Sequence, residues 1–265
     1  MWSDYLIQAA GATEKSFLAR RSEARSWSSS SSLQKRAAPI PYRSRRLPLS
    51  GSILGVTIDW QAWHEPCANE NSPLSRRLRL VQRHIASCLD ERPGDGLTGV
   101  SVCAGQGYDL LGVLATRADA RRVGCTPLEY DQRNVATARS GATGAALTNV
   151  KVVHADAGDL SAYVGSVPAD LLLLAGVFDN ISEDDVHRTI EALPQLCAPE
   201  ATVIWTRSRR APDLTPAVRR WLQAADLVEQ AFHAPDEVLF SVGVHRFVGV
   251  PRPLVPHGKL FDFFV

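Results

Sequence analysis

Residues 100–109 combine an apolar strand, a turn with two glycines and the start of a helix. The stretch reads Val100-Ser101-Val102-Cys103-Ala104-Gly105-Gln106-Gly107-Tyr108-Asp109. Gly105 and Gly107 lack a Cβ, so the backbone there can turn sharply and lie against a ligand. The helix that follows offers free N–H groups and the positive end of its dipole, which favour a carboxylate. The segment predicts a ligand site at the carboxyl end of a strand, where open α/β sheets bind their ligands.

Two glycines also occur in ordinary turns, so the residues around them are needed to indicate which class of ligand the turn could bind. The dinucleotide fingerprint needs a third glycine at position 110, which is Leu110 and therefore argues against a pyrophosphate cofactor. Glu129 ends the next apolar run, 24 residues after Gly105, close to the distance of about 20 at which an acid reaches ribose hydroxyls. One carboxylate can accept hydrogen bonds from both hydroxyls. We expect Glu129 to bind a ribose, with an ordinary surface residue as the alternative.

Polar and small residues follow the next two apolar runs as well. Asp156 comes after the third run, where an acid would accept a hydrogen bond from the exocyclic amine of an adenine. Asp159 competes with it, or caps a short turn at Leu160. The fourth run ends in Ala175-Gly176, whose small side chains would leave room for the reacting part of a ligand.

Candidate acceptor-binding and catalytic residues lie in two segments. Trp60, Trp63 and His64 belong to an aromatic stretch before the sheet, and Asp179-Asn180 follows the fourth strand. We expect Trp60, Trp63 and Asn180 to bind the substrate, and His64 or Asp179 to serve as general base where one is needed. The alternative for both tryptophans is the core of one helical turn, and for His64 a structural role.

Other titratable residues support weaker hypotheses. His187 is a further candidate base, but it lies within a predicted helix and is expected to be exposed. His64, Cys67 and Glu70 have a loosely metal-like spacing. Four convergent ligands are not visible, so no metal site is predicted.

The remaining pattern predicts an α/β fold with a doubly wound, mostly parallel sheet. Apolar runs without alternation are typical of strands that are covered on both faces, and their alternation with helices indicates parallel strands. The predicted strands are Gly99–Cys103, Cys125–Tyr130, Val150–His154, Asp170–Leu174 and Ala201–Thr206. The predicted helices are Asp109–Arg117, Gln132–Ser140, Glu183–Leu196 and Thr215–Ala225, besides a helix that begins after Ser72-Pro73 and carries Leu74, Leu78, Val81, Ile85 and Leu89 on one face.

The last two apolar runs, Leu227–His233 and Val238–Val248, are joined by a four-residue loop that suits only antiparallel neighbours. The sheet therefore ends in an antiparallel hairpin. We divide the chain into a disordered basic tail rich in Ser and Arg (1–52), an N-terminal helical cap segment (53–96), a Rossmann-like domain (97–250) and a C-terminal extension (251–265). Within the tail, Asp4–Arg21 is a candidate helix.

Composition excludes several function classes. The longest apolar run, Leu171–Phe178, is too short to span a bilayer, and five scattered cysteines without a secretion signal favour a reducing cytoplasm. The first 50 residues hold nine Lys or Arg and three Asp or Glu, which leaves the remainder with a net charge of −5. An acidic domain of this kind is not expected to bind nucleic acid specifically. No pattern indicates the oligomeric state.

Taken together, these residues resemble the class I S-adenosylmethionine-dependent methyltransferases over about Leu74–Val250. The first motif of that family, acid-x-Gly-x-Gly-x-Gly, here has Ser101 in place of the acid and Cys103 in place of the first glycine. The resemblance implies a sheet of order 3-2-1-4-5-7-6. It also implies S-adenosylmethionine as cofactor, bound by Ser101, Ala104, Gly105, Gly107, Glu129, Tyr130, Asp156, Ala157 and Ala175. Asp59–Pro66 with Ser72-Pro73-Leu74 is similar to a segment of uncharacterised bacterial members.

The resemblance implies methyl transfer to an acceptor that no motif identifies, and we expect a small molecule. The altered Ser101 and Cys103 keep open the alternative of a catalytically inactive binding module with the same fold. A nicotinamide-dependent oxidoreductase is a further alternative, against which Leu110 and the terminal hairpin both speak.

Overall fold

The computed structural model describes residue 59 and residues 72–94 and 96–263. The predicted tail (1–52), most of the first part of the predicted cap segment (53–71), the candidate helix Asp4–Arg21 and the residues Trp60, Trp63, His64, Cys67 and Glu70 lie outside the described residues. No helix in the described part is long and apolar enough to cross a membrane.

Seven strands form one sheet in the order β3-β2-β1-β4-β5-β7-β6, which is the order that the resemblance to the class I methyltransferases implies. Strands β1 to β5 pair in parallel, and β7 pairs antiparallel with both β5 and β6. The strands are β1 (Leu97–Val102), β2 (Val123–Glu129), β3 (Val153–His154), β4 (Ala169–Leu174), β5 (Cys197–Ser208), β6 (Leu227–His233) and β7 (Phe240–Phe247). Because β1 to β4 are parallel, the segments that follow them meet along one edge of the sheet.

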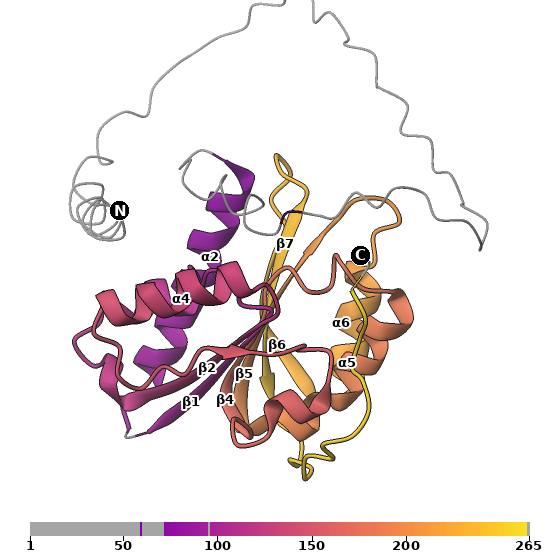
Figure 1. The fold of residues 1–265 in the computed structure, drawn as a ribbon. Helices are drawn as coiled ribbons and strands as arrows, with labels where there is room; N and C mark the ends of the chain where they lie inside the picture. Colours follow the sequence, from indigo (N-terminus) through magenta and orange to yellow (C-terminus); the bar gives the residue numbers. More distant parts are fainter. Residues whose placement is uncertain (1–58, 60–71, 95, 264–265) are drawn as a thin grey trace, which may run out of the picture. The chain divides into compact units, whose positions relative to one another are not determined.

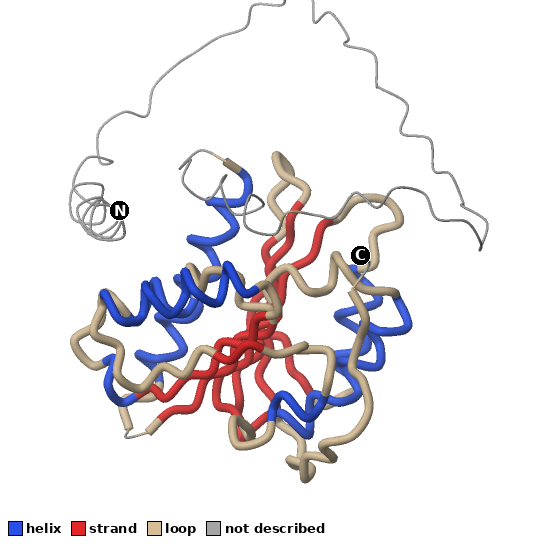
Figure 2. Tube along the Cα trace, in the orientation of Figure 1, coloured by secondary structure: helices blue, strands red, loops and turns tan. Residues whose placement is uncertain are grey.

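Helices cover both faces of this sheet (Figures 1 and 2). On one face lie α2 (Pro73–Glu91), α3 (Leu110–Leu114) and α4 (Gln132–Gly144), and on the other lie α5 (Glu183–Leu196) and α6 (Thr215–Ala224). Short 3₁₀ helices occur at Ala120–Arg122 (η2) and Leu160–Tyr163 (η3). The two faces carry separate clusters of buried apolar side chains. The arrangement is the doubly wound α/β class predicted from the sequence.

Local sequence signals explain where three helices begin. The Ser72 hydroxyl accepts from the Ser75 N–H at 3.0 Å, and Pro73 occupies the first helical position of α2. Asp131 caps α4 by accepting from Arg133 N–H, and Ser182 caps α5 by accepting from Asp185 N–H at 3.1 Å. The start of α2 after Ser72-Pro73 agrees with the sequence prediction.

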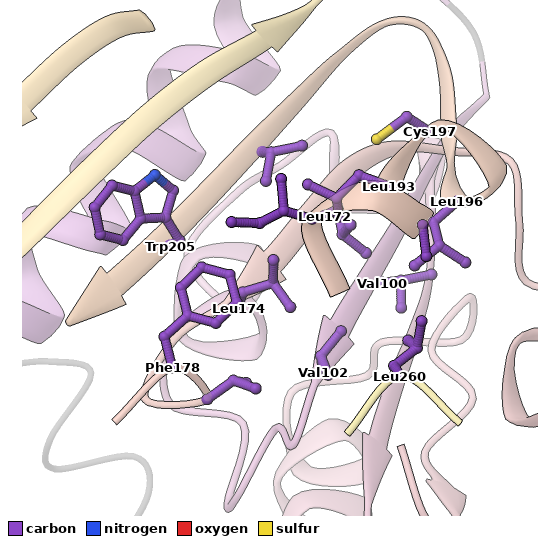
Figure 3. Close-up of a cluster of buried hydrophobic side chains, with 14 of the residues drawn as sticks. Val100, Val102, Leu172, Leu174, Phe178, Leu193, Leu196, Cys197, Trp205 and Leu260 are labelled. Carbon is purple, nitrogen blue, oxygen red and sulfur yellow. The ribbon is translucent and has the colours of Figure 1, made fainter. Parts of the chain in front are cut away.

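The core on the α5 and α6 face is built from β1, β4, β5 and the end of the chain. Trp205 and Phe178 are fully buried, with ring centroids 6.0 Å apart. Figure 3 shows Val100, Val102, Leu172 and Leu174 of the sheet beside them, together with Leu260 from the C-terminal segment.

The C-terminal segment after β7 runs alongside α5 and returns toward the loop that follows β3 (Figure 1, yellow). Arg252 N–H donates to the Pro194 carbonyl at 2.7 Å, at the end of α5. Leu260 and Phe261 are 1% and 0% exposed, so this segment contributes to the core.

Observed boundaries differ from the predicted ones where tertiary pairing decides them. Strand β3 contains only Val153–His154, because the preceding Val150 makes an isolated bridge with Cys125 outside the named strand. Strand β5 extends over twelve residues to Ser208, because β7 pairs with it along its whole second half. Helix α3 is shorter than predicted and ends at Leu114.

Candidate functional site

The glycine turn lies at the carboxyl end of β1 and is fixed against β2. Ala104 N–H donates to the Leu128 carbonyl at 2.8 Å, and Gly107 N–H donates to the Ala104 carbonyl at 2.9 Å. Gly107 has a φ of 78°, and a Cβ there would stand 2.5 Å from Leu111 Cδ1. A side chain at position 107 would be strained and would collide with α3. The glycine is therefore required for the turn.

Glu129 reaches this turn from β2. Its Oε2 accepts from Gly105 N–H at 2.7 Å, and its Oε1 accepts from Asp131 N–H at 2.8 Å. Glu129 is only 7% exposed, and burial raises the pKa of its carboxyl group. The two backbone donors and the side chain of Asn134 oppose that shift. The turn and the carboxylate that the sequence analysis paired are thus in direct contact.

Cys103 stands where the resembled motif has a glycine, and its backbone keeps the conformation that glycine favours. Its φ is 52°, in the left-handed region. Burial raises the pKa of its thiol well above the usual value, and the charges of Glu129 and Asp156 add to the effect. Cys103 therefore lies close to both candidate cofactor-binding carboxylates.

A buried carboxylate lies near Ser101, although the acid of the motif is missing. Ser101 is 1% exposed, and Asp109 is 8% exposed and accepts from Leu110 N–H at 2.6 Å. Burial raises the pKa of Asp109, and hydrogen bonds from Leu110 and Ser101, with the positive charge of Arg77, oppose this. In the sequence, Asp109 stands out only as the beginning of a predicted helix. Its type and its place after the turn were the available signal for a second acid.

Asp156 lies in the loop after β3, next to the end of β2. Ala155 N–H donates to the Glu129 carbonyl at 3.0 Å, which joins the two strand ends. Asp156 Oδ1 accepts from Gly158 N–H at 2.8 Å, and Oδ2 lies 3.3 Å from Lys259 Nζ. Lys259 was not predicted from the sequence, because it lies in the C-terminal segment and belongs to no motif.

The other predicted site residues near this edge, Ala157, Asp159 and Tyr130, differ in burial and in their contacts. Ala157 is 2% exposed, and its carbonyl accepts from the buried Tyr163 hydroxyl at 2.8 Å. Asp159, the competitor of Asp156, precedes η3 without a capping hydrogen bond from its side chain. Tyr130 is 74% exposed, and its carbonyl lies 2.8 Å from His154 Nε2.

Residues after β4 are tied to the end of β5. Gly176 N–H donates to Thr206 Oγ1 at 2.8 Å, and Asn180 Nδ2 donates to the Gly176 carbonyl at 2.7 Å. Ser208 N–H donates to both carboxylate oxygens of Asp179, at 2.8 and 3.1 Å. Ala175 lies at the start of this loop, beside Gly176. The Asp179 carboxylate thus fixes the loop against β5, which is a structural use of a candidate base.

His187 is on α5 and packs toward α6. Its ring centroid is 4.8 Å from that of Trp221, and its Nε2 is 3.9 Å from Glu191 Oε1. Within the described residues, no group of three or more His, Cys, Asp or Glu side chains is placed to hold a metal ion.

No protein-family model and no curated protein sequence matches the chain. Solved structures do match. An O-methyltransferase family protein from Burkholderia thailandensis has a TM-score of 0.50 at 15% identity, over 64% of this chain and 56% of that chain. A proposed O-methyltransferase from Nostoc punctiforme has a TM-score of 0.53 at 12% identity, over 71% of this chain and 59% of that one.

A third match is a protein described as a possible exported protein from Bordetella parapertussis, with a TM-score of 0.53 at 18% identity, over 71% of this chain and 79% of that one. The chain spans little more than half the length of the two O-methyltransferase-type proteins. With its strand order and its turn after β1, the chain has the fold of the class I methyltransferases.

Proposed function

We propose that the protein binds S-adenosylmethionine and transfers its methyl group to a small-molecule acceptor. The observation that carries this proposal is the contact of the Glu129 carboxylate with the N–H of Gly105. This contact holds the Glu129 carboxylate, which would accept hydrogen bonds from the ribose hydroxyls, against the turn that would bind the methionine part of the cofactor. In this proposal Asp156, whose loop is joined to the end of β2 through Ala155, recognises the adenine amine.

The residues present fit this cofactor. Glu129 uses each oxygen for one backbone N–H, which leaves acceptor capacity on both for two hydroxyls. The backbone of Ala104, Gly105 and Gly107 would lie against the ligand, and Ser101 with Asp109 would supply the polar group for its ammonium. Asp156 and Ala157 would hold the adenine, Tyr130 would cover the ribose side, and Ala175 would border the methionine.

When bound, the cofactor supplies a sulfonium-activated methyl group. The protein then has to place the acceptor atom in line with that group, and positioning of this kind contributes up to about 7–11 kcal/mol. Asn180 borders the acceptor side in this proposal, with Trp60 and Trp63 from outside the described residues. Because Asp179 is engaged by Ser208 N–H, His64 is the better candidate base for an oxygen acceptor.

Calorimetry with S-adenosylhomocysteine and Glu129 variants tests the proposal. Both Glu129→Gln and Glu129→Ala should weaken binding by at least about tenfold, because a charged group that accepts hydrogen bonds contributes about 1.5–3 kcal/mol. Glu200→Ala is the matched control and should bind as the wild type does. Glu200 is exposed and lies in the first half of β5, before the residues that pair with β7.

Glu129→Gln keeps one acceptor for the backbone donors, which guards against loss of the fold. A wild-type protein that binds no ligand at high micromolar concentration, or two Glu129 variants with wild-type affinity, would contradict the proposal.

The second candidate function is a catalytically inactive binding module. Ser101 and Cys103, which replace the acid and the first glycine of the motif, favour it. It predicts tight cofactor binding without turnover across a library of oxygen, nitrogen and sulfur acceptors. Methylation of any library member, detected by mass spectrometry, decides against it. A nicotinamide oxidoreductase is disfavoured by Leu110, which fills the third glycine position.

A further inference from the structure

The C-terminal strap, defined here as Arg252–Phe263, is bound to α5 over most of the helix. It begins where α5 ends, with Val255 N–H donating to Gln195 Oε1 at 3.0 Å. It returns toward the start of α5, where Asp262 N–H donates to Asp185 Oδ2 at 3.3 Å. The strap therefore runs antiparallel to α5, from the end of the helix back to its start, which lies at the edge of the sheet that carries the candidate site.

At that edge the strap pairs with the loop of Asp156. Leu160 N–H donates to the Gly258 carbonyl at 3.1 Å, and Leu260 N–H donates to the Gly158 carbonyl at 2.7 Å. These two bonds make an antiparallel bridge between Asp159 and Lys259. A Cβ at Gly158 would stand 2.2 Å from the Phe261 carbonyl oxygen, so the loop and the strap touch directly.

This pairing places Lys259 on the carboxylate of Asp156. Lys259 Nζ lies 3.3 Å from Asp156 Oδ2, while Asp156 Oδ1 is already held by Gly158 N–H. Lys259 also pairs with Asp262 of the strap itself. One Asp156 oxygen is therefore oriented by the backbone of its own loop and the other by the strap.

We infer that Lys259 is a positioning residue for recognition of the cofactor's adenine, acting through Asp156. The inference rests on the proposed function. The contact with Lys259 orients the second oxygen of the Asp156 carboxylate, and a carboxylate accepts hydrogen bonds without donating any, so it suits the 6-amino group of adenine. A 6-oxo purine presents an oxygen at that position and is repelled. The strap thus contributes to selection of an adenine-bearing ligand.

Binding of S-adenosylhomocysteine and of its 6-oxo analogue S-inosylhomocysteine tests the inference. Lys259→Met should weaken S-adenosylhomocysteine binding about five- to tenfold, as loss of one charge-assisted contact implies, and should lower the preference for the 6-amino ligand by a similar factor. Lys259→Arg should restore most of both. Lys151→Met removes an exposed lysine from the segment before β3 and is the matched control.

A double-mutant cycle separates action through Asp156 from direct contact with the ligand. In the Asp156→Asn background, Lys259→Met should cause no further loss, because the carboxylate that the lysine positions is gone. Equal losses in both backgrounds, or an unchanged preference between the two ligands in Lys259→Met, would overturn the inference. Failure of the wild type to bind S-adenosylhomocysteine would instead reject the proposed function, and the inference with it.

Discussion

Cys103 shows how a departure from a motif can keep the geometry that the motif serves. The left-handed conformation costs a residue with a side chain about 1 kcal/mol or more, and least where the side chain is small and unbranched. A thiol is small enough to accept the φ of 52°, and it sits close to Glu129 and Asp156 without adding charge because its pKa is raised. The glycine of the motif is therefore replaced without a change in the turn.

Substitution at Cys103 tests this account. Cys103→Gly should change the free energy of unfolding by less than about 1 kcal/mol, since glycine adopts the left-handed region freely. Cys103→Val should lower it by about 2 kcal/mol, because a β-branched residue is strongly disfavoured at positive φ. Urea denaturation measures both. Equal stability of the two variants would show that backbone conformation does not govern this position.

At the scale of elements, the C-terminal strap is an integral part of the fold. Its backbone pairs with the β3 loop and its apolar side chains enter the core formed by β1, β4 and α5. Phe261 is fully buried and meets Phe263 edge to face, with ring centroids 5.5 Å apart. The division of the chain that treats 251–265 as an extension stays a prediction, but these contacts tie the segment to the domain before it.

Truncation of the buried Phe261 side chain tests whether the strap is part of the cooperative fold. Phe261→Ala should lower the free energy of unfolding by about 3–5 kcal/mol, the cost typical of removing a buried aromatic side chain. Val255→Ala, at a strap residue that is 55% exposed, is the control and should change it by less than about 0.5 kcal/mol. A loss under about 1 kcal/mol for Phe261→Ala would mean that the strap unfolds separately from the sheet.

For the whole molecule, the buried His245 on β7 links stability to pH. It is 1% exposed, and its Nδ1 accepts from Trp205 Nε1 at 3.3 Å. Indole N–H only donates, so this nitrogen has to be unprotonated in the folded protein. Burial lowers the pKa of His245 to about 4, and Arg219 adds to the effect, while the charge of Glu229 opposes it.

The sign of the effect follows from that shift. The unfolded chain takes up a proton near pH 6.5 and the folded one only near pH 4, so stability is lost as pH falls between these values. At pH 5 the loss from this group should be about 2 kcal/mol. His245→Asn, which keeps an acceptor for the indole, should show a correspondingly flatter pH dependence in urea denaturation. Parallel curves for variant and wild type would contradict the assignment.

The sequence alone determined the class of fold, and it predicted where the candidate site lies. Apolar runs and a short final loop are local signals, and they predict the parallel α/β class and the terminal antiparallel hairpin. The full strand order, which the structure confirms, came from the resemblance to the class I methyltransferases. The sequence also placed Glu129 and the glycine turn at the same edge of the sheet, because neighbouring parallel strands end at the same edge.

Only the tertiary structure decided what those carboxylates touch. Lys259 reaches Asp156 because the chain after β7 turns back along α5, a path that no local pattern specifies. In the same way, Asp179 looks available in the sequence and proves to be bound to Ser208 N–H on β5. Contacts between distant segments depend on how the whole chain packs, and packing is a property of the folded molecule and not of any short stretch within it.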